Sequence, residues 1–196
     1  MKSDNFSKKL IVVLALFAAQ VFSQNSFTDT RDGKKYKAVK IGEQVWMAEN
    51  LNYNAEGSKC YANNEAHCKT YGRLYNLETA EIVCPAGWHL PNDDEWKKLL
   101  RFAGEGNIAG TKLKAKKGWN SDGNGTDDFD FSALPCGYGI QTLGSFYHLG
   151  EIGYWWSATE NNKGGAYYRF MLYESDIAGW NSNSKDLLLS VRCLQD

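Results

Sequence analysis

The clearest periodic pattern in the chain is an apolar stripe downstream of Asn92. Its members recur at the i, i+3, i+4, i+7 spacing of one helix face, and they are Trp96, Leu99, Leu100 and Ala103. Asn92 followed three residues later by Glu95 has the pattern of a capping box, and Gly104 supplies a stop. These signals predict a helix that begins after Asn92, ends before Gly104 and buries its stripe.

A second, shorter helix is predicted just upstream. Asn76 is a suitable N-cap. The positions that share one face after it are Leu77, Ala80 and Cys84. Pro85 and Gly87 then stop the helix, so we expect Cys84 at its end.

Most of the remaining pattern indicates strands. Residues 35–41 and 44–48 are β-rich and flank Gly42-Glu43, which predicts a two-residue hairpin. Later strands are expected at residues 154–158, 166–173 and 187–194, whereas residues 104–150 are rich in Gly and Asn. Early helices followed by antiparallel strands predict an α+β fold.

The N-terminus has the composition of an export signal. Lys2, Lys8 and Lys9 precede an apolar run over residues 10–19. That run is shorter than the roughly 20 residues that span a bilayer. We therefore expect a cleaved signal peptide (1–23), a polar leader (24–34) and one domain (35–196), with no transmembrane segment after cleavage. The mature protein would be secreted, periplasmic or at the cell surface.

Charge argues against a nucleic-acid partner. The chain has a net charge of −1, and removing residues 1–23 leaves 19 basic and 22 acidic side chains, a net charge of −3. Because the two signs are interspersed, no basic stripe for nucleic acid or an anionic membrane is indicated. Aromatic residues make up 14% of the chain, which suits either a core of large rings or an aromatic binding surface.

Five cysteines in an exported chain predict two disulfides and one spare thiol. Fifteen such arrangements exist. Cys60 and Cys68 flank a short loop and form a local candidate pair. A zinc site using Cys60, His67, Cys68 and Cys84 is the competing interpretation. The seven residues between Cys60 and Cys68 do not match the tight ligand spacing of structural zinc sites, and export favours oxidation.

A Gly-rich acidic loop is the best candidate for a metal site. Its oxygen-bearing side chains are Asp122, Asn124, Thr126, Asp127, Asp128 and Asp130. Alternating oxygen ligands can wrap calcium, but the loop lacks the bidentate Glu of an EF-hand. We favour the alternative of a solvated turn whose Asp and Asn side chains accept bonds from backbone amides.

Seven blocks in order resemble the Fibrobacter succinogenes major paralogous domain, an exported bacterial family. The blocks are VKIGEQVWMAENL (39–51), YGRLYN (71–76), CPAGWHLP (84–91), GNGTDD (123–128), FSALP (131–135), GYWWSAT (153–159) and SVRC (190–193). Their order also resembles C-type-lectin and formylglycine-generating-enzyme folds. This wider resemblance implies two short helices packed on twisted antiparallel strands, stapled by a Cys84–Cys193 disulfide, with Cys136 left as the free thiol.

The sugar-binding signature of calcium-dependent lectins is absent. The chain has no Glu-Pro-Asn or Gln-Pro-Asp triplet, and Ser182 replaces the carboxylate expected after Trp180-Asn181. Trp180 with Asn181 and Asn183 could still bind a glycan without metal, although we favour the alternative of a core tryptophan beside a polar turn. Formylglycine-generating enzymes use a close cysteine pair with copper, whereas Cys136 and Cys193 are far apart in sequence.

We therefore expect an exported, non-catalytic surface or extracellular binding module, with polysaccharide or protein as its partner. The alternatives are a formylglycine-generating-like enzyme that uses Cys136, and a structural envelope protein.

Overall fold

The computed structural model describes residues 26–104 and 107–196. The expected signal peptide lies outside these residues. The helices are η1 (Tyr61–Asn63, a 3-10 turn), α1 (Glu65–Tyr71), α2 (Leu77–Ile82), α3 (Asp93–Ala103) and α4 (Ala109–Leu113). The strands are β1 (Ser26–Thr28), β2 (Lys35–Ile41), β3 (Gln44–Met47), β4 (Leu74–Tyr75), β5 (Trp88–His89), β6 (Cys136–Ile140), β7 (Ser145–Leu149), β8 (Ile152–Glu160), β9 (Gly165–Leu172), β10 (Ala178–Ser184), β11 (Leu187–Ser190) and β12 (Leu194–Gln195). Short helices combined with mainly antiparallel strands confirm the α+β class.

The smaller sheet has the strand order β1-β2-β3-β12-β5, and every pairing in it is antiparallel. The β2–β3 hairpin confirms the predicted turn, because Ile41 pairs with Gln44 across Gly42-Glu43. Gly42 has a φ of 61°, the positive value that such a tight turn requires. Strand β1 lies within the expected polar leader and pairs with β2, so part of that leader belongs to the fold.

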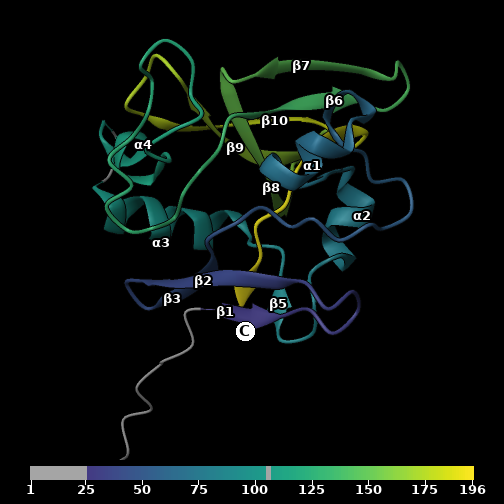
Figure 1. Cartoon of the computed structure of the whole chain (residues 1–196), viewed down its shortest axis with the longest axis horizontal. Coiled ribbons are helices and arrows are strands. Elements are labelled where there is room, and N and C mark those ends of the chain that lie inside the picture. The colour runs from purple at the N-terminus through teal and green to yellow at the C-terminus, as the bar shows by residue number, and fades with distance from the viewer. Residues whose placement is uncertain (1–25, 105–106) are drawn as a thin grey trace, which may run out of the picture.

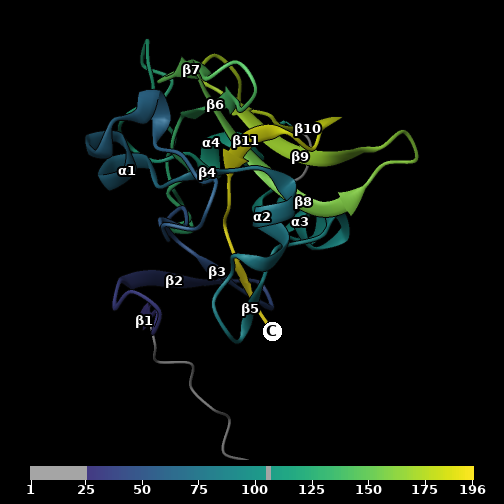
Figure 2. The ribbon, with the colours of Figure 1, turned by 90° about the vertical axis from the view of Figure 1, so that its right-hand side faces the viewer.

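The larger sheet has the order β10-β9-β8-β11-β6-β7, with β4 paired to β11. Its pairings are antiparallel except β11–β8 and β6–β8, which are parallel. The long β8–β9 hairpin projects from the body of the molecule (Figure 2). The smaller sheet lies at the bottom of Figure 1 and the larger sheet at the top, with α2 and α3 at intermediate height.

Helix α3 begins and ends as its capping signals predict, and α2 starts after its Asn76 cap. Helix α2 ends at Ile82, however, so Cys84 lies just beyond it and not at its last position. Both helices pack against β8. The short helices α1 and α4 were not predicted from the sequence.

The C-terminal segment connects the two sheets. Its strand β11 belongs to the larger sheet and its strand β12 to the smaller one, as the yellow ribbon in Figure 2 shows. Cys193, in the buried stretch between them, forms a disulfide with Cys84, and a second disulfide joins Cys60 to Cys68. Both expected disulfides are confirmed, and the zinc interpretation is wrong because Cys60, Cys68 and Cys84 are all oxidised.

Two hydrophobic clusters form the core. One contains Tyr75, Trp156 and Leu189 against α2, and the other contains Trp46, Trp96 and Trp155. These four of the seven tryptophans are fully buried, so most of the tryptophans serve packing. In the described residues, no helix is long and apolar enough to cross a membrane.

Candidate functional site

The candidate site is built on the first turn of α3. The Asn92 side chain accepts hydrogen bonds from the backbone N–H groups of Asp94 and Glu95, each at 3.0 Å. Glu95 Oε2 accepts the Asn92 N–H at 2.8 Å, which completes the capping box. This reciprocal bonding orients the acidic residues of the first turn.

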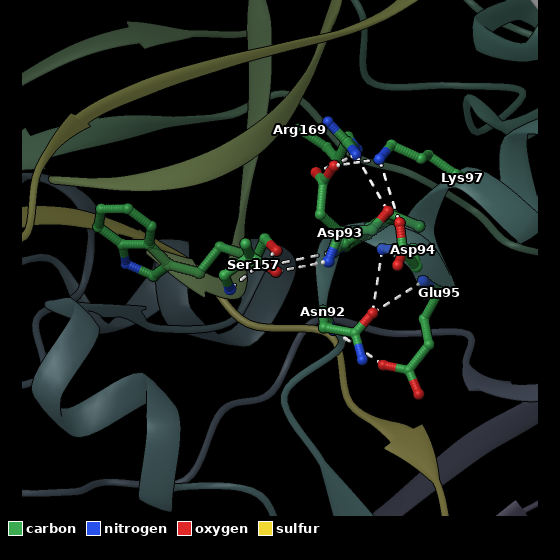
Figure 3. Close-up of polar contacts among 10 residues, drawn as sticks. Asn92, Asp93, Asp94, Glu95, Lys97, Ser157 and Arg169 are labelled. Atoms are coloured by element: carbon green, nitrogen blue, oxygen red, sulfur yellow. Dashed lines mark hydrogen bonds and ion pairs between the residues drawn. The ribbon is translucent and has the colours of Figure 1, made fainter. Parts of the chain in front are cut away.

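The acidic turn is attached to the larger sheet. The Asp93 N–H donates to Thr159 Oγ1 of β8 at 2.9 Å. The Asp93 carboxylate accepts hydrogen bonds from Arg169 Nη2 of β9 and, at 3.0 Å, from Lys97 Nζ. Figure 3 shows Asp93 between these two cations. Residues far apart in sequence therefore meet at one point.

Arg169 is a buried charge that depends on Asp93. It is 1% exposed, and its Nε and Nη1 atoms have no hydrogen-bond partner in the part of the chain that the structure describes. Burial lowers the pKa of Arg169, whereas the Asp93 carboxylate acts in the opposite direction. Asp93 thus compensates a desolvated guanidinium beneath the surface.

An exposed tryptophan lies beside this turn. Trp180 on β10 pairs with Arg169 across the sheet, and its side chain is 63% exposed. Its ring contacts Tyr167 edge-on, with centroids 5.6 Å apart and an interplanar angle of 68°. A cleft of about 560 Å³ lies between these rings and the first turn of α3, with Thr159 on its lining. We call this cavity the Trp180 cleft.

The Trp180 cleft combines an apolar ring with a polar rim. Asp94, whose side chain is 84% exposed, offers a carboxylate, and Lys98 offers an ammonium group. Tyr167 and Thr159 add hydroxyl groups. The lining contains no histidine or cysteine. Because Asp93 is engaged by two cations and Glu95 by the helix cap, these two acids serve the fold.

The structure separates the other residues predicted to bind with Trp180. Strand register pairs Trp180 with Arg169, Asn181 with Tyr168 and Asn183 with Ala166. Since successive side chains point to opposite faces of a strand, Asn181 and Asn183 lie on the other face from Trp180. The exposure of Trp180 also shows that the core-tryptophan interpretation is wrong.

The acidic loop at residues 122–130 is bonded internally. Asp127 accepts hydrogen bonds from the Ser132 N–H and hydroxyl, at 2.7 and 2.6 Å. Asn124 Oδ1 accepts the Trp119 N–H at 3.1 Å. In the described residues, the side chains that bring potential metal-ligand atoms close together are Cys60, Glu65 and Cys68, which lie outside this loop. The two cysteine sulfurs of that group are bonded to each other in a disulfide. The loop thus has the bonding of a turn, and we do not propose calcium for Asp122, Thr126, Asp128 or Asp130.

Cys136 is a free thiol in the interior. Its Sγ lies 2.9 Å from Ser190 Oγ, and Asn50 Nδ2 donates to it at 3.7 Å. Burial raises the pKa of the Cys136 thiol, which disfavours the thiolate. Cys193, which the copper-enzyme hypothesis would need as its partner, is bound to Cys84.

Sequence reasoning selected Trp180 but missed its neighbours. Thr159 and Arg169 reach Asp93 across 66 and 76 residues, a relation that no local pattern reveals. One signal was present, because Arg169 is a charge within the otherwise apolar strand 166–173. A buried charge usually requires a partner.

The chain was also compared with known proteins. The family model of the Fibrobacter succinogenes major domain matches residues 39–195. No curated protein and no solved structure matches the chain. The match covers the larger sheet, the smaller sheet except β1 and the start of β2, all four α-helices and the Cys84–Cys193 disulfide. The chain therefore belongs to the Fibrobacter succinogenes major domain family.

Proposed function

We propose that this protein is an exported, non-catalytic module that binds a polysaccharide at the Trp180 cleft. The observation that carries the proposal is the 63% exposure of Trp180 beside a polar rim. Large aromatic side chains dominate binding energetics when they become buried against a partner. A sugar ring presents a face of C–H groups that suits the negative face of an indole.

The rim supports the same class of ligand. Sugar hydroxyls both donate and accept hydrogen bonds, so a binding site needs acceptors and donors close together. Asp94 provides acceptors, and Lys98 provides donors. The cleft volume of about 560 Å³ falls within the roughly 300–1,000 Å³ of small-ligand sites. A short saccharide segment suits this size.

We further propose that the scaffold is C-type-lectin-like. This assignment is supported by the disulfide that joins Cys84 to Cys193 across 109 residues, and by α2 and α3 packed on β8. Export is supported by the signal-like N-terminus and by two disulfides, which persist in oxidising compartments. The enzyme alternative has less support, because Cys136 is buried and its thiol pKa is raised.

The test uses the chain without residues 1–23. A glycan array identifies retained polysaccharides, and affinity electrophoresis then measures wild type, Trp180→Ala and Tyr147→Ala. Tyr147 is the control because it is an exposed aromatic, 40% exposed, on the distant strand β7. We expect Trp180→Ala to weaken binding about 30-fold, as for a central aromatic anchor, and Tyr147→Ala to have no effect. Failure of wild type to retain any polysaccharide, or equal binding by all three proteins, would contradict the proposal.

A further inference from the structure

A second and larger cavity is a groove of about 1170 Å³. It lies between β2, the C-terminal end of α1, and residues 48–52, 115–117 and 127–134. We call it the lysine groove. Its volume exceeds the roughly 300–1,000 Å³ of small-ligand pockets. It therefore has room for several units of a polymer.

Lysines dominate the charge of this groove. The exposed members are Lys35, Lys37, Lys40, Lys69, Lys116 and Lys117. Lys34 also lines it, giving seven lysines against four carboxylates, Glu49, Asp127, Asp128 and Asp130. The lining thus carries three more positive than negative charges, whereas the whole chain has a net charge of −1. A groove with one predominant sign concentrates ions of the opposite sign.

These ammonium groups are not engaged by the protein's own acids. In the described part of the chain, none of the seven lysine Nζ atoms lies within 4.0 Å of a carboxylate oxygen. Lys34 instead donates to the Asn52 carbonyl at 2.9 Å. The exposed lysines remain available to a ligand.

A further positive charge lies beneath the floor. Arg192 is fully buried, and its guanidinium donates to Asn50 Oδ1 at 2.8 Å, to the Ser132 carbonyl at 3.3 Å and to the Phe131 carbonyl. Asn50 and Ser132 both line the groove. Burial lowers the pKa of Arg192 to about 10, so the guanidinium stays charged at neutral pH. Because its partners are neutral groups, this charge adds to the positive potential above it.

We propose that the lysine groove binds an acidic polysaccharide that carries carboxylate groups. The lining contains no arginine, whose planar fork recognises a single carboxylate or phosphate in a fixed geometry. Lysines act as flexible point charges, which suits a polymer with repeated negative charges. Glu49, Asp128 and Asp130 can accept hydrogen bonds from the hydroxyl groups that a polysaccharide carries on every unit.

This inference goes beyond the proposed function. The lysine groove and the Trp180 cleft share no lining residue, so either site can fail without the other. The two sites could engage different parts of one acidic glycan, but each is tested by its own variant.

The experiment uses polygalacturonate as the acidic probe, dextran as a neutral probe and single-stranded DNA as a phosphate probe. The chain without residues 1–23 is compared with a groove variant, Lys37→Glu/Lys116→Glu. The control variant, Lys59→Glu/Lys163→Glu, makes the same change in net charge at two exposed lysines outside both cavities. Binding is measured by biolayer interferometry at low and high salt, and folding of each variant by circular dichroism.

We expect wild type to bind polygalacturonate at low salt, and to bind dextran and DNA more weakly. The groove variant should lose about tenfold in affinity while the control changes less than about twofold, because only the first removes charges that face the ligand. Binding should weaken as salt rises to about 0.5 M, since screening shortens the range of the lysine charges. No binding of polygalacturonate, equal losses in both variants, or tighter binding of DNA would each overturn the proposal.

Discussion

The rings of Tyr167 and Trp180 meet edge to face, with their centroids 5.6 Å apart. Both residues lie on paired strands, where Tyr167 of β9 is opposite Ser182 of β10. This contact holds an indole that is 63% exposed in a defined orientation before any ligand arrives. A preorganised aromatic anchor reduces the entropy lost on binding.

Replacing Asp93 with Asn should destabilise the protein by about 3 kcal/mol, because it leaves a buried guanidinium without its counter-charge. Arg169 is 1% exposed and has its ion pair with Asp93. Asp94→Asn is the matched control one position away, on a side chain that is 84% exposed, and should change stability by less than about 0.5 kcal/mol. Urea unfolding measures both values.

A double variant tests whether the loss of stability in Asp93→Asn comes from the unpaired charge of Arg169. Asp93→Asn/Arg169→Met removes the charge together with its partner, and should recover part of the stability lost in the single variant. If Asp93→Asn costs no more than Asp94→Asn, Arg169 does not depend on Asp93.

Stability should fall as pH rises above about 6.5, because His89 is better stabilised when protonated in the folded state. Its Nδ1 lies 2.6 Å from Asp196 Oδ1 and its Nε2 lies 3.1 Å from Glu95 Oε1. Burial lowers the pKa of His89, but these two carboxylates outweigh it and the net shift is upward. A histidine whose pKa is raised in the folded state stabilises the fold when it is protonated. That stabilisation is present at low pH and is lost as the pH rises through the folded-state pKa.

The size of this effect is modest because the His89 side chain is 38% exposed. Between about pH 5.5 and 8, wild type should lose about 0.5 kcal/mol more than His89→Gln in chemical unfolding experiments. An identical pH dependence in both proteins would contradict this role for His89.

The two disulfides should contribute unequally to stability. The sequence separation is 109 residues between Cys84 and Cys193, and 8 residues between Cys60 and Cys68. In the chain-entropy model these loops correspond to about 4.7 and about 2.6 kcal/mol. The Cys84→Ser/Cys193→Ser variant should therefore lose about 2 kcal/mol more than Cys60→Ser/Cys68→Ser in denaturant unfolding. Equal losses of stability in the two variants, or a larger loss in Cys60→Ser/Cys68→Ser, would contradict the chain-entropy model for these disulfides.

Cys136 should be unreactive in the folded protein. It is 1% exposed, and burial raises its thiol pKa. Ellman's reagent should modify no thiol under native conditions and one thiol per chain after unfolding, with Cys136→Ser as the blank. Rapid native labelling would restore the enzyme hypothesis that depends on this residue.

Local signals in the sequence predicted local structure. Asn92 with Glu95 defined the start of α3, and Gly42-Glu43 defined the β2–β3 turn, because each signal acts through its own neighbours. Helices α1 and α4 were missed because they have seven and five residues, too few for a periodic stripe. The α4 start also has no side-chain cap.

The candidate site was predicted only in part. Trp180 was named as a candidate binding residue, but a core position was favoured for it, and its strand was read as a polar turn because Asn181 and Asn183 disfavour strands. These residues adopt the extended conformation because their backbone pairs with strand β9, a contact that is distant from local sequence preference. The contacts of Asp93 with Thr159 and Arg169 depend on how the chain folds over 66 and 76 residues, which propensity does not encode.

The most direct test of a ligand at Trp180 is protection from oxidation. Limited N-bromosuccinimide treatment followed by peptide mass spectrometry measures the modification of each tryptophan, with and without a saturating amount of the polysaccharide found on the array. Trp180 should be oxidised first because it is 63% exposed while Trp46, Trp96, Trp155 and Trp156 are fully buried. We predict that bound polysaccharide slows oxidation of Trp180 at least several-fold. Unchanged oxidation of Trp180 in the saturated complex would contradict the proposed binding site.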